Sequence, residues 1–204
     1  KEWFPLPNTV EQALADSRVL VVEADVTNIE AMTKTTEAMV YKPPDELSKH
    51  VPPADYARFR AQLERLGVPE ASVKNLKPFP AVSLLMFAEW QRLGYSPQYG
   101  IDGYLLRKAK AERKSILELE GVEAQSQLVD SLTEPEQRTV CAGTLCALES
   151  GLTGEQIEGM VKAWQLGDAC LLLEVSRRYN EKVPGAAELE ERFVWSRHEA
   201  MLAK

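Results

Sequence analysis

Two glutamates close the two segments of this sequence that most resemble β-strands. Glu23 ends the run that begins at Arg18, with Asp25 two residues later, and Glu120 ends the run that begins at Ser115. Ligands gather at the carboxyl ends of strands in open sheets, so carboxylates placed there can bind a metal or act as general acid or base. The other interpretation is that both glutamates merely cap neighbouring helices.

Arg197 is the cation that we expect beside these carboxylates. A carboxylate at a strand end is costly unless it faces solvent, a metal or a cation, and the planar fork of an arginine can hold it by two hydrogen bonds. We therefore predict that Glu23, Glu120 and Arg197 converge on one cleft. The alternative is that Arg197 pairs with a surface acid such as Glu190 or Glu191.

The elements that must position these residues are two strands among many helices. Four consecutive aliphatic residues predict a strand over 18–23 that is buried on both faces, and a second strand is predicted over 115–120. Helical periodicity covers most of the rest, with capping-box spacing at Thr133 and again at Thr153. The predicted helices span residues 9–16, 56–66, 78–93, 133–150, 153–166, 168–179 and 186 to the end.

This pattern predicts an α/β fold, mostly helical, with a small mixed central sheet and a large helical insertion. Two strand patterns separated by a long helical stretch can be joined only by long-range pairing, so we expect them to be neighbours in one sheet. The helices from 28 to 113 are predicted to form a cap on one side of it. The economical interpretation is a single domain over residues 1–204.

Composition restricts the class of protein. A chain of 204 residues that is 45% hydrophobic is long enough for a core of its own. The 24 basic and 31 acidic residues give a net charge of −7, which argues against nucleic acid as a partner. The longest apolar runs, 81–88 and 169–173, are far short of the roughly 20 residues that cross a bilayer. Oligomeric state and redox compartment stay open.

Standard catalytic signatures are absent from the sequence. The two histidines, His50 and His198, are far apart and form no zinc pattern with the cysteines. There is no His-Glu-x-x-His, Gly-x-Ser-x-Gly or Gly-rich phosphate loop. The candidate chemistry therefore depends on the carboxylates.

Structural roles are the simpler interpretation for several other side chains. Asp102 opens a predicted helix, where an acid is satisfied by free backbone amides. Trp90 and Trp164 lie on apolar helical faces and are predicted to pack in the core, whereas His50 is predicted in a surface loop. Three cysteines are predicted to be buried, unpaired thiols: Cys141, Cys146 and Cys170.

Taken in their order along the chain, several short segments of this sequence resemble the TraB/GumN family, which includes the animal Tiki proteins. The matching stretches occur in family order and cover nearly the whole chain. They are Phe4-Pro-Leu-Pro7, Val21-Val-Glu23-Ala-Asp25, Lys77-Pro78, Gly100-Ile-Asp102, Leu119-Glu120 with Gln125, Trp164 with Gly167-Asp168, and Arg197 with Ala200-Met201.

The resemblance implies a metal-dependent hydrolase, most simply a peptidase acting on a peptide or secreted protein. Tiki members look like metal-dependent proteases that trim secreted Wnt proteins, bacterial TraB members are linked to the shutdown of peptide pheromones, and the GumN name comes from a polysaccharide gene cluster. A divalent metal held by histidines and Glu23 would polarise the carbonyl and activate water. Glu23, Glu120 and Arg197 would be catalytic, with Asp102, Gln125 and His198 binding or orienting the substrate. Export to the periplasm or cell surface is also implied.

Two Gly-x-x-His motifs that are typical of the family are missing from this chain. By the resemblance, one lies just before residue 1 and the other beyond residue 204, so we expect a domain truncated at both ends. The chain itself is then expected to hold no catalytic metal and to be inactive. A late Arg-Asn pair of the family reads Arg197-His198 here. The alternative from another functional class is a non-catalytic helical module that captures a peptide in a groove.

Overall fold

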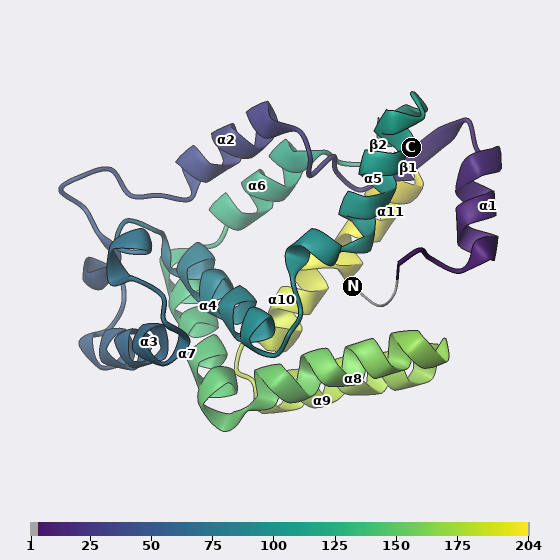
Figure 1. The fold of residues 1–204 in the computed structure, drawn as a ribbon. Coiled ribbons are helices and arrows are strands. Elements are labelled where there is room, and N and C mark those ends of the chain that lie inside the picture. Colours follow the sequence, from purple (N-terminus) through teal and green to yellow (C-terminus); the bar gives the residue numbers. More distant parts are fainter. Residues whose placement is uncertain (1–3, 204) are drawn as a thin grey trace.

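The protein is mostly helical, with one two-stranded sheet in the part of the chain that is described (Figure 1). The computed structural model describes residues 4–203, excepting the side chains of residues 31, 32, 34 and 38. The predicted fold class, a mostly helical α/β fold with a small sheet, is confirmed.

The α-helices and strands are α1 Asn8–Asp16, β1 Val19–Val22, α2 Ile29–Ala38, α3 Pro53–Leu66, α4 Pro78–Arg92, α5 Ile101–Ala111, β2 Ser115–Glu118, α6 Val122–Asp130, α7 Glu134–Ser150, α8 Leu152–Leu166, α9 Ala169–Lys182, α10 Ala186–Phe193 and α11 His198–Leu202. Short 3₁₀ helices are η1 Leu47–Lys49, η2 Glu70–Ser72, η3 Pro97–Tyr99 and η4 Trp195–Arg197.

The two strands pair as predicted. β1 and β2 are parallel neighbours, in a register that sets Val19 opposite Ser115 and Val22 opposite Glu118. Their carboxyl ends therefore lie at the same edge of the sheet.

The prediction that the first strand is buried on both faces is wrong. Val19, Val21 and Leu117 are 43%, 52% and 48% exposed. Helix α5 packs against both strands and covers one face, and the alternate residues of the strands point away from it. A continuous aliphatic run does not by itself indicate that both faces are covered.

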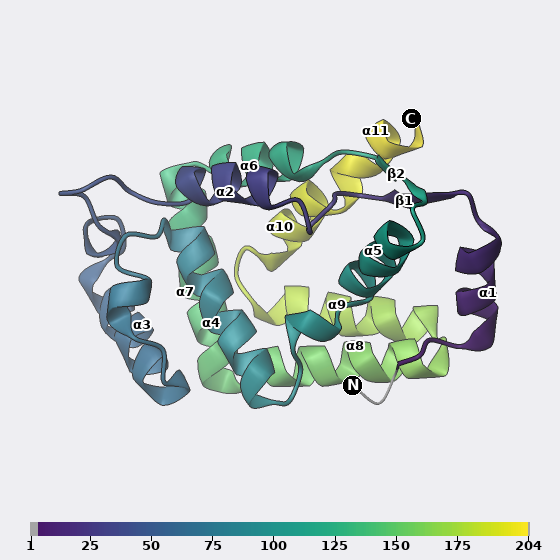
Figure 2. The ribbon, with the colours of Figure 1, turned by 45° about the horizontal axis from the view of Figure 1, so that its top comes forward.

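The helices between the strands do not form a single cap, which corrects a second expectation. Only α5 among them packs extensively on the sheet, whereas α2 packs on α6, and α3 and α4 pack on α7 (Figure 2). The apolar faces of α3 and α4 match that of α7, and these helices bury each other. The largest core cluster lies here, with Phe59, Leu85 and Leu145 almost completely buried.

Helix α7 begins as the sequence predicts, but α8 does not. The Thr133 side chain accepts a hydrogen bond from the Glu136 amide, and the Glu136 carboxylate accepts one from the Thr133 amide, which makes a capping box. Thr153, by contrast, is 1% exposed inside α8, which starts at Leu152 directly after the tight turn at Gly151. The turn leaves no extended residue to act as the cap.

The predicted final helix is interrupted. Helix α10 ends at Phe193, the backbone at Val194 leaves helical geometry with φ −123° and ψ −71°, and η4 connects α10 to α11. This break determines where Arg197 lies.

Predictions of burial fail for one tryptophan and two cysteines. Trp164 on α8 is 59% exposed, and Cys146 on α7 and Cys170 on α9 are exposed free thiols, whereas Cys141 is buried as predicted. Helices α8 and α9 pack closely on each other, with Gly159 against Val175. Trp164 lies on another side of α8, together with Met160 and Val161. Apolar spacing on a helix indicates an apolar face, and it does not say what covers that face.

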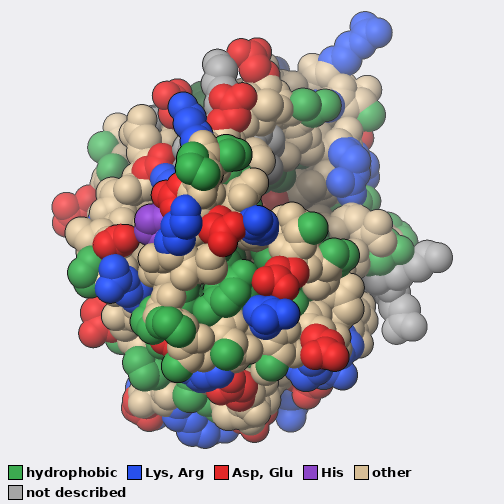
Figure 3. Space-filling view, turned by 90° about the vertical axis from the view of Figure 1, so that its left-hand side faces the viewer, with side chains coloured by type: hydrophobic (Ala, Val, Ile, Leu, Met, Phe, Trp, Pro, Cys, Tyr) green, Lys and Arg blue, Asp and Glu red, His purple; other side chains and the backbone are tan. Residues whose placement is uncertain are grey.

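Charges of both signs are interspersed over the face of the molecule seen in Figure 3. That face carries no continuous basic surface of the kind that binds nucleic acid. Among the residues that the structure describes, no helix combines the length and the apolar character needed to span a membrane.

A candidate active site at the strand ends

The backbone fixes Glu23 and Glu120 side by side just beyond the strands. The carbonyl oxygen of Glu23 accepts hydrogen bonds from the amides of Glu120, at 3.0 Å, and Gly121, at 2.9 Å. Gly121 has φ +90°, a conformation that side chains with a Cβ rarely adopt. The parallel ladder therefore extends into the loops that carry the two candidate carboxylates.

Arg197 joins both carboxylates, which confirms the predicted convergence. Its Nε donates to Oε1 and Oε2 of Glu120, both at 3.1 Å, and its Nη2 donates to Oε2 of Glu23 at 3.0 Å. The same Nη2 also bonds Glu120 closely. Residues separated by 174 positions in the sequence thus share one cluster, which we call the acid–arginine cluster: Glu23, Glu120 and Arg197.

The three members of the cluster differ in burial and in free bonding capacity. The side chains of Glu120 and Arg197 are 14% and 17% exposed, whereas that of Glu23 is 57% exposed. Arg197 also donates from Nη1 to the Phe193 carbonyl, so each of its nitrogens is engaged. Hydrogen bonding to Glu120 raises the pKa of the Arg197 guanidinium, which stays charged. Oε1 of Glu23 has no partner among the described residues, so Glu23 is the member that is free to react.

Of the three residues expected to bind or orient substrate, only Gln125 joins the cluster. Its Nε2 donates to Oε2 of Glu23 at 3.4 Å. Asp102 is exposed in the first turn of α5, and within residues 4–203 it makes no hydrogen bond to the cluster. His198 is exposed and packs edge-to-face on Trp195, with ring centroids 5.3 Å apart.

A second ionic group lies next to the cluster. Lys110 contacts Asp25 at 2.7 Å, and the Asp25 amide donates to the carboxylate of Glu118 at 2.8 Å. Burial acts to raise the pKa of Asp25, but hydrogen bonds from Lys110 and Thr27 outweigh it and lower that pKa overall. Asp25 therefore stays ionised and paired, and it anchors the loop that follows Glu23.

Comparison with known proteins identifies the relatives of this chain. The sequence profile of the TraB/PrgY/gumN family matches residues 1–204. The chain belongs to the TraB/PrgY/gumN family. Two curated relatives, both called uncharacterized protein YbaP, from Escherichia coli K12 and Shigella flexneri, are 26% identical over 134 residues. That alignment covers 65% of this chain and 48% of each relative, so the chain spans about half the length of the curated relatives it matches. No solved structure matches the chain at comparable significance.

The side chains described for this TraB/PrgY/gumN member do not fit a divalent metal by themselves. Within residues 4–203 no three His, Cys, Asp or Glu side chains gather closely enough to hold one. Glu23 offers one free carboxylate oxygen, but Glu120 is held by Arg197 and no imidazole joins them. A metal at this position would need ligands from outside the described residues.

Sequence reasoning missed a second cluster of titratable groups in this family member. His50 lies between Asp45, 2.9 Å from Nε2, and Glu134, 3.0 Å from Nδ1, and stacks on Tyr41 with ring centroids 4.0 Å apart. His50 lies in the turn that ends η1, in keeping with the prediction of a loop, and its side chain is 20% exposed. Glu134 comes from α7, 84 positions away, and no local pattern could have indicated that contact.

Proposed function

We propose that this chain forms the core of a hydrolase that cleaves peptides or secreted proteins, with the acid–arginine cluster as its reactive centre. The observation that supports this proposal is the convergence of Glu23, Glu120 and Arg197 at the carboxyl ends of two parallel strands. Membership in the TraB/PrgY/gumN family supports it as well.

Within this proposal the three residues of the cluster have different roles. Glu23 is the acid–base residue, because its carboxylate is the exposed one and keeps an oxygen free for a water molecule. The ion pair of Glu120 with Arg197 positions Glu23, because Nη2 of Arg197 holds Oε2 of Glu23 in place. The engagement of every Arg197 nitrogen favours this positioning role over direct contact with a developing oxyanion.

The divalent metal stays part of the proposal for the longer protein. Glu23 would be the ligand contributed by this chain, and the other ligands would be histidines from outside it. We also propose that the protein is exported to the periplasm or cell surface. Metal analysis of the purified full-length protein and fractionation of cells that express it test these two points.

The test of the catalytic role compares matched glutamate variants of the full-length protein. Fluorogenic peptides are the substrates, with and without a chelator. Glu23→Gln is expected to lower kcat/KM by about 10²-fold or more, the usual contribution of a general acid–base group. Glu191→Gln, on the exposed surface of α10, is expected to retain activity.

Two results would contradict the proposal. Unchanged activity of Glu23→Gln would remove the assigned acid–base residue. Peptide cleavage by neither the wild-type protein nor any variant, with every variant folded, would favour a non-catalytic peptide-binding module instead.

A further inference from the structure

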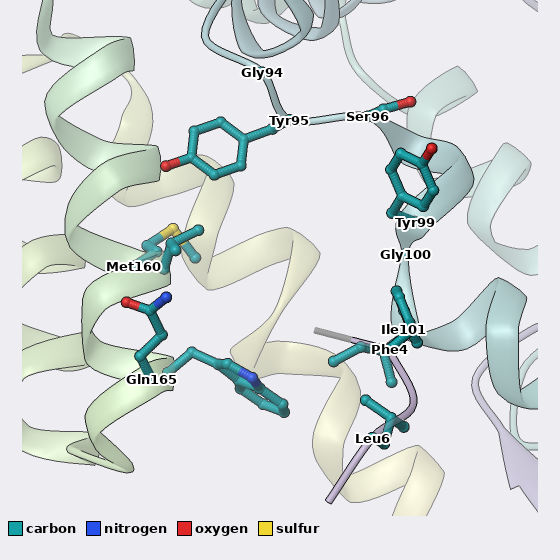
Figure 4. Close-up of a pocket in the computed structure, with 12 residues that line it drawn as sticks. Phe4, Leu6, Gly94, Tyr95, Ser96, Tyr99, Gly100, Ile101, Met160 and Gln165 are labelled. Atoms are coloured by element: carbon teal, nitrogen blue, oxygen red, sulfur yellow. The ribbon is translucent and has the colours of Figure 1, made fainter. Parts of the chain in front are cut away.

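A cavity of about 690 Å³ lies apart from the acid–arginine cluster. It opens to solvent and is bordered by the chain before α1, the loop from Gly94 to Gly100, the start of α5 and one side of α8 (Figure 4). Its size is that of sites that hold small ligands or a few side chains. The residues that matter to the argument are Phe4, Tyr95, Ser96, Tyr99, Trp164 and Gln165.

The lining of this cavity is aromatic and uncharged. None of the described residues that line it carries a charge, although 27% of the chain is charged. Trp164 and Tyr99 are 59% and 40% exposed, so much of the surface of each ring stays accessible to a ligand. Such a surface favours large uncharged groups and disfavours phosphates and carboxylates, which would lose their hydration with no cation to replace it.

The few polar groups of the cavity suit a peptide backbone. The peptide group between Tyr95 and Ser96 makes no backbone hydrogen bond among the described residues, and Ser96 is extended, with φ −130° and ψ 133°. Gln165 adds an amide that can both donate and accept. In Figure 4 the Gln165 side chain points up along the cavity wall toward Met160. This peptide group, next to an extended residue, can form a hydrogen bond with the backbone of an extended ligand chain.

Helix α5 relates the cavity to the acid–arginine cluster. Gly100 and Ile101, at its start, line the cavity, and its body packs on β1 and β2. Figure 2 shows α5 running back against the strand direction, so its start lies toward the strand ends that carry Glu23 and Glu120. Helix α5 therefore connects the wall of the cavity to the sheet whose strand ends carry the cluster.

We infer that this cavity binds large uncharged side chains, aromatic or aliphatic, of an extended peptide. The inference rests on the proposed function for the presence of a peptide substrate, and it adds which side chains that substrate carries. Trp164 is the main contact, because its indole is the largest exposed aromatic surface of the lining.

The test measures binding without cleavage. It uses the full-length protein carrying Glu23→Gln and two fluorescein-labelled peptides, Ser-Gly-Phe-Leu-Trp-Gly-Ser and Ser-Gly-Ala-Ala-Ala-Gly-Ser, with anisotropy as the readout. The peptide with Phe, Leu and Trp is expected to bind at least about tenfold more tightly than the alanine peptide. Trp164→Ala is expected to remove most of that preference, because truncation of an aromatic contact residue commonly causes a large loss of binding. Leu166→Ala is the matched control, because Leu166 is 64% exposed on the same helix outside the cavity lining.

Four outcomes would overturn the inference. The two peptides could bind equally, Trp164→Ala could leave the preference intact, or Leu166→Ala could abolish it to the same extent. A concentration-dependent dimer that Trp164→Ala abolishes, without peptide binding, would assign the cavity to a second copy of the chain. Because anisotropy needs no turnover, loss of catalysis and loss of this binding are separate results.

Discussion

Arg197 forms ion pairs with two glutamates that differ in their exposure to solvent. Glu120 is 14% exposed and receives hydrogen bonds from both Nε and Nη2, whereas Glu23 is 57% exposed and receives one from Nη2. Water screens an exposed pair strongly and a sheltered pair weakly. The two ion pairs should therefore contribute differently to stability even though they share one guanidinium.

A double-mutant cycle tests this difference. Combining Arg197→Gln with Glu120→Gln is expected to give a coupling free energy of about 2 kcal/mol, in the range of charged hydrogen bonds. Combining it with Glu23→Gln is expected to give less than about 1 kcal/mol, as for exposed pairs. Urea unfolding measures both values. Equal couplings would show that burial does not distinguish the two pairs.

His50 is expected to make stability depend on pH. Burial acts to lower the pKa of His50, but hydrogen bonds to Glu134 and Asp45 outweigh it, and the pKa is raised above its ordinary value of 6.5. The folded state therefore holds the proton more tightly than the unfolded state does. The resulting stabilisation is fully present below about pH 6.5 and is lost as the pH rises through the raised pKa.

The measurement is the free energy of unfolding against pH above 6.5. Wild type is expected to lose stability over this range more steeply than His50→Gln, which lacks the titrating group. His198→Gln keeps the His50 cluster and should follow the wild-type curve. Parallel curves for wild type and His50→Gln would rule out the role of His50.

At the scale of elements, the break between α10 and α11 matters most to the site. The sequence from residue 186 onward has helical character throughout, and sequence reasoning predicted one helix there. In the structure the chain leaves helical geometry at Val194, and η4 carries Arg197 to Glu120 and Glu23. The convergence was predictable from the chemistry of an arginine near two carboxylates, but the turn that produces it was not.

The reason is that local patterns report on local structure. The capping box at Thr133 and the parallel pairing of the strands follow from short motifs and from the need to join two aliphatic runs. Which face is covered follows from distant partners, so the exposure of Val21 and of Trp164 could not be read from periodicity. The same holds for His50, whose partner Glu134 lies on α7.

Gly143, on α7, lies close against the backbone of the turn between α9 and α10. A Cβ added there would overlap the Pro184 carbonyl oxygen, which is backbone and cannot move alone. Gly143→Ala is therefore expected to destabilise the protein by about 1–3 kcal/mol, the usual cost of overpacking. The comparison is Gly154→Ala, whose Cβ would meet Leu93 at an ordinary 3.4 Å and which should be neutral or stabilising by up to about 1 kcal/mol. Denaturant unfolding decides, and a neutral Gly143→Ala would contradict the close contact.

At the scale of the whole molecule, stability is unevenly distributed. The largest core cluster lies among α3, α4 and α7, while the sheet has two short strands with residues such as Val21 and Leu117 exposed. Two strands with one face exposed hold little buried apolar surface. The catalytic candidates are therefore placed on the less stable part of the fold.

Hydrogen exchange is expected to reveal this gradient. Amides in α4 and α7 should exchange slowest, because their exchange requires opening of the main core, and amides in β1 and β2 should exchange faster through local opening. The protein is labelled with deuterium at neutral pH, exchange is quenched with acid, and mass spectrometry of peptic fragments measures both rates. Strand amides as protected as those of α7 would show that the sheet and the core open as one unit.

The long sequence separations within the acid–arginine cluster also bear on how the chain folds. Arg197 meets Glu120 across 77 positions and Glu23 across 174, whereas contacts among α7, α8 and α9 join neighbours in sequence. Closing long loops costs entropy before any contact compensates for it, so local helical pairs form first and distant pairings form late. During synthesis the helices can assemble while Arg197 is still absent from the growing chain. The acid–arginine cluster is therefore complete only when nearly the whole of this chain has been made, and unfinished molecules carry the two carboxylates without the arginine that joins them.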